Sequence, residues 1–351
     1  MELKNYSESI RIAIAGCGIL PLFIVLQIFY YVDHSLFVDM VVFPDTEWYH
    51  SIFVSFRGGG NVPQWVHDPF QQRVLFPFIT AIFYNLTYPI MPMSEEWYFF
   101  AVNSILMVGV GMLLYMLLKT YTSNNFALLG VWLHNLSYPV VWYFLAGLTD
   151  TLGYLFVLIC LIILKSYKKD EDTWTATTKD FVYFIVLMIG IVVRESVLIT
   201  LPVWLYIKYK QKPRDWVKAG YSRNDKVFGA FVELLSPFVI CGAFFLYYGM
   251  SNKTHFNLPP ANWWFVTLLC LVPFVPFVLM WKMNKQDSVY TTTVLLYTLY
   301  SLFFAAYDGR FLVLGYPIWV ALNLQALEKL YHWAINEKEL MNRASEALEH
   351  G

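Results

Sequence analysis

Apolar residues recur along this chain in long runs that short polar segments interrupt. A helix needs roughly 20 apolar residues to cross the hydrocarbon core of a bilayer. The clear runs of about that length are Ile12–Tyr31, Trp97–Leu118, Phe228–Met250, Trp263–Trp281, Val289–Tyr307 and Phe311–Leu327. The less regular apolar stretches are Val74–Ile90, Phe126–Leu145, Thr151–Leu164 and Phe181–Tyr206. The pattern predicts an all-α, polytopic membrane protein with roughly ten transmembrane or re-entrant helices.

Composition supports this interpretation. Hydrophobic residues make up 58% of the 351-residue chain and charged residues only 14%, whereas a soluble protein carries about 25% charged residues. Because a folded core cannot bury that apolar excess, we expect it to face lipid. A net charge of −1 supplies no basic field, so no nucleic-acid partner is expected. The cysteines lie in separate apolar runs without metal-ligand spacing, so no cofactor is indicated, although a divalent metal stays open.

The distribution of lysine and arginine predicts the topology. Seven of them lie within Lys208–Lys226, and such excesses are typical of cytoplasmic loops. The segment 32–72 then becomes a large first extracytoplasmic loop. We expect a membrane domain over residues 1–327 and a cytoplasmic amphipathic tail helix over 328–351. A prokaryotic plasma membrane is favoured, with the endoplasmic reticulum as the alternative.

One apolar stretch conflicts with a straight crossing. The segment 165–169 is rich in lysine and also indicates the cytoplasm. A single helix over Phe181–Tyr206 would therefore join two cytoplasmic loops, which is impossible. We predict a hairpin over 181–207 whose halves are too short for a core of about 30 Å. Arg194 and Glu195 would lie at its tip.

Charges at membrane depth are the first candidates for function. Placing Arg194 or Glu195 in mid-membrane costs about 2.5–3.5 kcal/mol on insertion scales. Adjacent residues do not face each other on a helix, so a mutual ion pair does not explain them. Arginine also binds phosphate oxygens through two parallel hydrogen bonds. The hypothesis is therefore an anion-binding site at Arg194.

Two further candidates belong to the first extracytoplasmic loop and its end. Asp45 follows a proline and precedes Trp48 and Tyr49, which are suited to the membrane interface. A carboxylate at this position can remove a proton from a hydroxyl group, and the alternative is a solvated loop aspartate. Arg73 begins an apolar run, where the alternative is an arginine that snorkels to the interface.

Other polar residues interrupt later apolar segments. Asp150 begins a span, where it could also simply complement the helix dipole. Asp308 and Arg310 flank Gly309 in a short turn and could form only a local salt bridge. His134 and Asn135, like Glu233, are more typical of structural polar groups with satisfied hydrogen bonds.

The order of these elements resembles the GT-C superfamily of membrane glycosyltransferases. The matching segments are Asp45 with Trp48-Tyr49, Arg73-Val-Leu-Phe-Pro77, Gly-Leu-Thr-Asp150, the segment from Val193 to Pro202, and the segment from Tyr307 to Pro317. The resemblance covers the chain up to about Leu327. The chain departs from the family pattern in having no Asp-x-Asp in its first loop.

The resemblance implies a function and a set of roles. Such enzymes transfer a sugar from a lipid-linked, polyprenyl-phosphate donor to a lipid, glycan or protein acceptor, here with inversion. It implies that Asp45 is the general base and that Arg194, with Arg310, holds the donor phosphate. The remaining residues expected to shape the substrate site are Arg73, Asp150, Glu195 and Asp308.

Two other classes of protein fit the same pattern. A transporter or lipid flippase also uses charges at the midplane and broken helices, but usually shows two corresponding halves, which are not evident here. A non-catalytic membrane subunit would explain the tail helix but not the charges at positions 194 and 195. An assay with radiolabelled polyprenyl-phosphate sugars separates the enzyme from both alternatives.

The topology is testable by cysteine labelling. In a chain whose own cysteines are replaced, Gly60→Cys should react with an impermeant maleimide from outside intact cells. Lys218→Cys should react only after the membrane is permeabilised, because the Lys/Arg excess places it in the cytoplasm. Reaction of both cysteines from the same side would contradict the topology.

Overall fold

The computed structural model describes residues 8–18, 20, 44–61, 66, 73–135, 149–167, 178–194, 197–198 and 200–210, together with 324–325, 327–328, 331–332, 334–336 and 338. The regular elements in these ranges are α-helices, apart from a 3₁₀ turn at 197–198, and none of the described residues forms a strand. The all-α prediction is therefore confirmed for this part of the chain. The predicted spans from Phe228 to Tyr307 lie outside the described residues.

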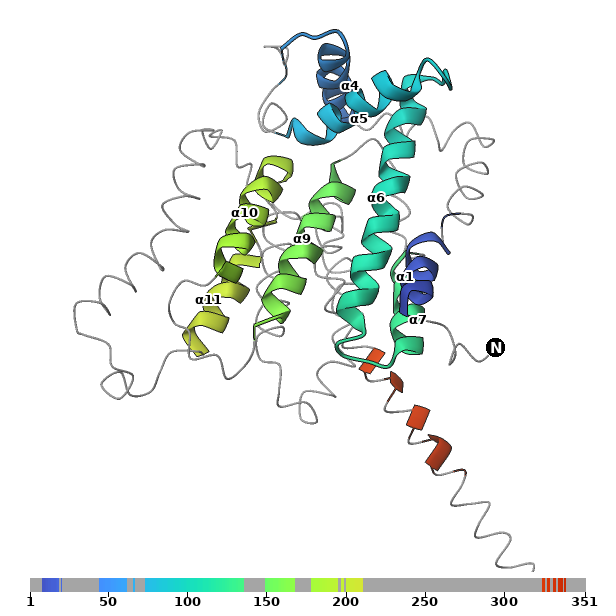
Figure 1. The fold of residues 1–351 in the computed structure, drawn as a ribbon, viewed down its shortest axis with the longest axis vertical. Helices are drawn as coiled ribbons and strands as arrows, with labels where there is room; N and C mark the ends of the chain where they lie inside the picture. Colours follow the sequence, from blue (N-terminus) through green and yellow to red (C-terminus); the bar gives the residue numbers. More distant parts are fainter. Residues whose placement is uncertain are drawn as a thin grey trace, which may run out of the picture.

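The helices follow one another along the first part of the chain. In order they are α1 (Glu8–Cys17), α4 (Pro44–Arg57), α5 (Leu75–Thr87), α6 (Glu95–Leu118), α7 (Asn124–Asn135), α9 (Asp150–Lys165), α10 (Thr178–Val193) and α11 (Thr200–Lys210). Helices α6, α9 and α10 pack side by side, while α4 and α5 pair and cover one end of this group (Figure 1). We call this the α4 end. The turn between α6 and α7 marks the opposite end.

Within the described residues, α6 contains the one helix segment that is long and apolar enough to cross a membrane. That segment, Trp97–Leu118, has the bounds expected from the sequence. Helix α5 has 13 residues, or about 20 Å at 1.5 Å per residue, and is too short to cross. The stretch Val74–Ile90 therefore contributes no full crossing.

Small residues bring α1 and α6 into close contact. A Cβ atom at Gly111 would lie 2.4 Å from the Ala15 carbonyl oxygen, and one at Gly16 would lie 2.8 Å from Met112 Cγ. Glycine at both positions therefore permits the two backbones to approach, as is common between helices in membranes. At the end of α6, Lys119 Nζ donates to Glu8 Oε1 at 2.5 Å.

Helices α10 and α11 form the hairpin that the sequence predicts. Helix α10 ends at Val193 and α11 begins at Thr200. Contacts across the two arms pair residues progressively further from the turn. They are Gly190 beside Val197, where an added Cβ would lie 2.8 Å from Val197 Cγ1, then Tyr183 Oη 3.0 Å from Thr200 Oγ1, and Trp204 Nε1 donating to Asp180 Oδ1 at 2.7 Å. The arms are therefore antiparallel, and Arg194 lies at the turn.

Described residues at and just before the start of the tail contact the α6–α7 turn. Glu328 accepts a hydrogen bond from the Ser123 backbone N–H at 3.1 Å, and Gln325 Nε2 donates to the Tyr121 carbonyl at 3.0 Å. The ring of Tyr331 lies edge-on to Phe126, with centroids 6.0 Å apart. The beginning of the tail is therefore fixed to the helical body by polar and aromatic contacts.

Candidate functional site

The described helices bury charged side chains in an apolar interior. These are Arg73, Asp150, Asp180 and Arg194, with exposed fractions of 8%, 5%, 4% and 2%. Burying an isolated charge is costly, so each such group needs a partner. Asp180 lies near the start of α10 and accepts hydrogen bonds from Tyr167 and Trp204. The other three belong to the α4 end.

Asp150 and Arg194 form a buried ion pair through Asp150 Oδ1 and Arg194 Nη1. Asp150 is the first residue of α9, and Arg194 directly follows α10. The carboxylate thus sits at a helix N-terminus, where the dipole favours negative charge. The sequence indicated both residues as candidates and correctly placed Asp150 at a helix start, but it did not predict that they are partners.

Gly153 makes room for this pair. A Cβ atom there would lie 3.1 Å from Arg194 Cβ and 3.3 Å from Arg194 Cδ. The arginine side chain therefore runs along the first turn of α9 before its guanidinium reaches Asp150. Sequence reasoning missed Gly153, although its position three residues after Asp150 on the same helical face is the signal that points to it.

A chain of hydrogen bonds links Thr149, the residue before Asp150, to α4 and to Arg73 before α5. Arg73 Nη1 donates to Tyr49 Oη at 3.3 Å, and Tyr49 Oη lies 3.3 Å from Thr149 Oγ1. Arg73 stands just before α5, Tyr49 is fully buried in α4, and Thr149 precedes Asp150. The structure therefore brings three predicted elements together, namely the first-loop helix, Arg73 and the start of α9.

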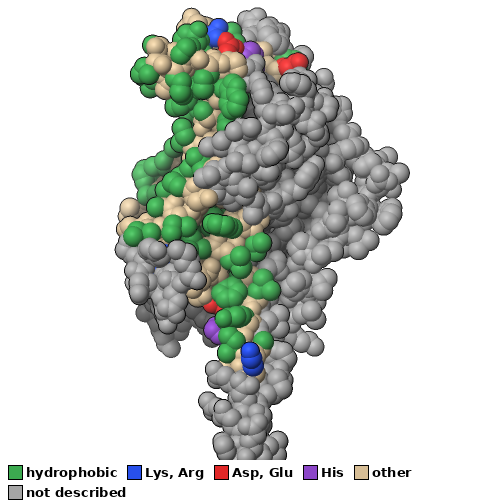
Figure 2. Space-filling model, turned by 90° about the vertical axis from the view of Figure 1, so that its right-hand side faces the viewer, with side chains coloured by type: hydrophobic (Ala, Val, Ile, Leu, Met, Phe, Trp, Pro, Cys, Tyr) green, Lys and Arg blue, Asp and Glu red, His purple; other side chains and the backbone are tan. Residues whose placement is uncertain are grey.

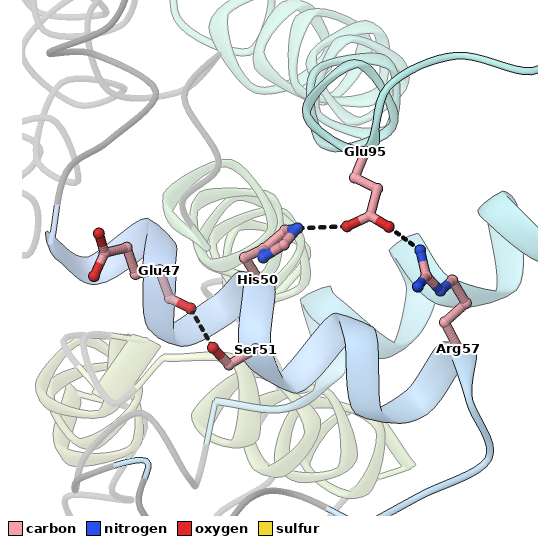
Figure 3. A network of polar contacts seen from close by, with 5 residues as sticks. All are labelled: Glu47, His50, Ser51, Arg57 and Glu95. Carbon is pink, nitrogen blue, oxygen red and sulfur yellow. Dashed lines mark hydrogen bonds and ion pairs between the residues drawn. The ribbon is translucent and has the colours of Figure 1, made fainter.

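Asp45 lies in the first turn of α4. Its side chain is outside the described residues, but its backbone is four residues before Tyr49, and positions four apart share a helix face. Glu47 is exposed, and Figure 3 shows its side chain pointing away from the side chains of His50 and Glu95. The α4 backbone thus places Asp45, but not Glu47, on the face that carries Tyr49.

A second polar cluster, which the sequence did not indicate, fixes α4 to the start of α6. Glu95 accepts from His50 Nε2 at 2.6 Å and forms an ion pair with Arg57 (Figure 3). The Arg57 guanidinium also lies 5.2 Å from the centre of the Tyr84 ring. Because these charged side chains are partly exposed, their main consequence is the placement of α4.

His134 and Asn135 are buried, and His134 is hydrogen-bonded on both ring nitrogens, whereas Asn135 Nδ2 has no hydrogen-bond partner among the described residues. His134 Nδ1 lies 2.8 Å from Asn135 Oδ1, and its Nε2 lies 2.8 Å from Tyr154 Oη. The His134 and Tyr154 rings are also stacked, with centroids 5.2 Å apart. These buried hydrogen bonds join α7 to α9 one turn beyond Asp150.

The remaining candidates lie outside the described residues. They are Glu195, Asp308, Arg310 and Glu233. In the part of the chain that the structure describes, no group of three or more histidine, cysteine, aspartate or glutamate side chains could hold a metal ion. The described part of the candidate site consists of α4 with Tyr49, Arg73 and the Asp150–Arg194 pair.

Comparison of the chain with models of known protein families, with curated proteins and with solved structures finds no match. Neither sequence similarity nor fold similarity therefore selects among the enzyme, transporter and subunit hypotheses.

The ion pair should be a strong determinant of stability. Asp150→Asn leaves the buried Arg194 charge uncompensated, and breaking a buried pair in this way costs about 3–5 kcal/mol. The matched control is Glu8→Gln, which breaks the exposed pair with Lys119 and should cost at most about 1 kcal/mol. Thermal unfolding in detergent measures both. Equal losses in the two variants would contradict the assignment.

Proposed function

We propose that this chain is an integral, multi-pass membrane glycosyltransferase of the GT-C type. It transfers a sugar, with inversion, from a polyprenyl-phosphate donor to a lipid, glycan or protein acceptor on the extracytoplasmic side. The observation that carries the proposal is the meeting of the buried Asp150–Arg194 pair, Arg73 and Tyr49 of α4 at one end of an apolar helical body.

The distribution of exposed and buried side chains supports the membrane placement. Large apolar side chains are exposed on the outer sides of the helices, including Ile105 at 57%, Leu133 at 50% and Phe181 at 67%, while arginine and aspartate are buried. Soluble proteins show the reverse preference for charged groups. Figure 2 shows hydrophobic side chains covering much of the described surface between charged groups near its two ends. Such a surface is suited to lipid.

The charges at the α4 end favour an anionic ligand. Two arginines, Arg73 and Arg194, and one aspartate, Asp150, are buried there. Their formal charges sum to +1 before Asp45 is counted. A guanidinium carries five N–H donors in a planar fork, so a carboxylate and a phosphate can share it. The bond to Asp150 would orient Arg194 for the donor phosphate.

The position of α4 supports a base close to this phosphate site. Asp45 shares a helix face with Tyr49, whose hydroxyl contacts both Arg73 and Thr149. In the proposed reaction, Asp45 takes the proton of the acceptor hydroxyl, and that oxygen forms a bond to the anomeric carbon. The bond from the anomeric carbon to the phosphate oxygen breaks, and the electron pair leaves with the phosphate. Arg194 stabilises the charge that develops there.

The residues outside the described ranges take the roles that the resemblance implies. Arg310 would assist Arg194 in holding the donor phosphate. Glu195 and Asp308 would contact the substrates near the same site. These roles are part of the proposal and rest on the sequence motifs alone.

One observation also suits a transporter or flippase. The α10–α11 hairpin, with a charged residue at its turn, resembles the broken helices that such proteins use to bind substrates. Purified protein given a radiolabelled polyprenyl-phosphate sugar distinguishes the two classes. Release or transfer of the sugar supports the enzyme, whereas movement of intact donor between the leaflets of proteoliposomes supports the flippase.

The catalytic base is tested by replacing Asp45 with a nearly isosteric amide. Loss of a positioned base typically lowers the rate 10²–10⁴-fold, so Asp45→Asn should bind donor normally and lose turnover by about that factor. Single-turnover transfer at saturating donor measures the loss.

Glu47→Gln is the matched control for Asp45→Asn. Glu47 is exposed and lies about 200° from Asp45 around the helix at 100° per residue. Its replacement should therefore leave transfer close to that of the native chain. The assignment of the base is wrong if Asp45→Asn transfers sugar normally, or if Glu47→Gln loses more activity.

The phosphate contact is tested by Arg194→Lys. Lysine keeps the charge but replaces the planar fork with a single ammonium, so donor affinity should fall about tenfold or more. Equilibrium binding of a polyprenyl-phosphate sugar measures the effect. Arg57→Lys, in the partly exposed cluster on α4, is the control and should bind donor normally. Unchanged donor affinity in Arg194→Lys would remove Arg194 from the phosphate site.

A further inference from the structure

Helix α5 has an apolar outer face that the proposed reaction does not explain. Its exposed residues Phe78, Ile82 and Leu86 follow one another at four-residue spacing, with exposed fractions of 44%, 44% and 69%. The opposite face is buried through residues that include Phe76 and Ala81. Because residues four apart lie one above another on a helix, the exposed side chains form one continuous stripe.

The stripe continues into the turn that follows α5. Ile90 is 86% exposed and Met91 is 52% exposed. Tyr88, 45% exposed, lies between the stripe and these residues and stacks on Tyr84. A stripe and turn with this composition are costly in water, where apolar surface is unfavourable.

The position of α5 relative to α6 indicates what covers this surface. Helix α5 lies across the end of the helical body instead of along it (Figure 1). The membrane-crossing segment of α6 begins at Trp97, only a few residues after Met91. Since Trp is typical of the membrane boundary, the turn after α5 lies close to the level at which headgroups meet the acyl chains.

The charged groups at the same end agree with this placement. The cluster of His50, Arg57 and Glu95 is partly exposed and fixes α4, which packs on α5. Figure 2 shows charged side chains at the top of the described surface, with hydrophobic side chains beside them and continuing below. This is the charge distribution of an element that faces water on one side and lipid on the other.

We propose that the outer stripe of α5 and the turn after it insert into the extracytoplasmic leaflet of the membrane, with phospholipid as the occupant. The helix then lies in the membrane plane, with its apolar face about 5–10 Å into the boundary between headgroups and acyl chains. This inference rests on the membrane placement proposed above and is independent of the sugar transfer.

The insertion has a consequence for the candidate site. Arg73 lies two residues before the start of α5 and donates a hydrogen bond to Tyr49 of α4. A helix held at the headgroup level therefore holds Arg73 at the depth where the phosphate of a membrane lipid lies. The two helices would fix the site relative to the bilayer surface, so that a lipid-linked donor reaches it by moving sideways within the leaflet.

Spin labelling tests the insertion. Single cysteines replace Ile82, Leu86 or Ile90 in the full chain, with the native cysteines replaced, and each carries a nitroxide label. The protein is reconstituted in vesicles of phosphatidylcholine and phosphatidylglycerol, and power saturation compares collisions with oxygen and with a water-soluble nickel chelate. Asn61→Cys, at an exposed position after α4, is the water control. Ile105→Cys, on the exposed side of α6, is the lipid control.

The expected result is lipid-like labels at 82, 86 and 90, with oxygen collisions exceeding nickel collisions by severalfold, and a water-like label at 61. Water-like labels at 82, 86 and 90 beside a lipid-like label at 105 overturn the insertion alone. Labels shielded from both reagents overturn it as well, because another protein surface then covers the stripe. A water-like label at 105 overturns the membrane placement itself.

Discussion

The ion pair between Asp150 and Arg194 is the constraint on which the arrangement of the described helices depends. Neither charge tolerates an apolar interior alone, and the two residues belong to different elements, the start of α9 and the turn of the α10–α11 hairpin. The chain must therefore bring these ends together. Gly153 allows the approach, since a side chain there would meet the arginine stem. At the base of the hairpin, Asp180 accepts hydrogen bonds from Tyr167 and Trp204 and fixes the two arms against each other.

Helix α4 depends on this arrangement from one side and on α6 from the other. Tyr49 joins it to Arg73 and to Thr149, the residue before Asp150, while His50 and Arg57, on a neighbouring side of the helix, join it to Glu95. A short helix with mixed composition thus acquires a fixed rotation. That rotation matters for function, because it turns the face that carries Tyr49 toward Arg73 and Thr149, and by helix spacing position 45 belongs to that face while position 47 does not.

Sequence patterns predicted individual helices and helix breaks better than the contacts between residues of different helices. The break at Arg194, the helix start at Asp150 and the bounds of the α6 span follow from hydrophobic runs and the charges that interrupt them. The pairing of Asp150 with Arg194 does not, because it joins residues 44 positions apart (194 − 150). In a membrane helix, the sides facing lipid and protein are both apolar. Thus Asn103 on the buried side of α6 and Ile105 on its exposed side lie in one run without charged residues, and hydrophobic periodicity does not assign the rotation that creates a site.

The same ion pair sets a conflict between stability and ligand binding. Before a donor binds, Asp150 compensates the Arg194 charge and so avoids the free-energy cost of an unpaired buried charge in the folded protein. Once a phosphate is present, the carboxylate competes with it for the guanidinium and repels it. Under the proposed function, Asp150→Asn should therefore lower stability while leaving donor affinity equal or higher, because the amide oxygen can still accept the orienting hydrogen bond from Arg194 while the repulsion of the phosphate is removed. If the pair were purely structural, removing the Asp150 charge would lower both stability and donor affinity, because the site would be lost with the fold. The contrast between the two measurements separates a pair that only holds helices together from one that also prepares an arginine for an anionic substrate.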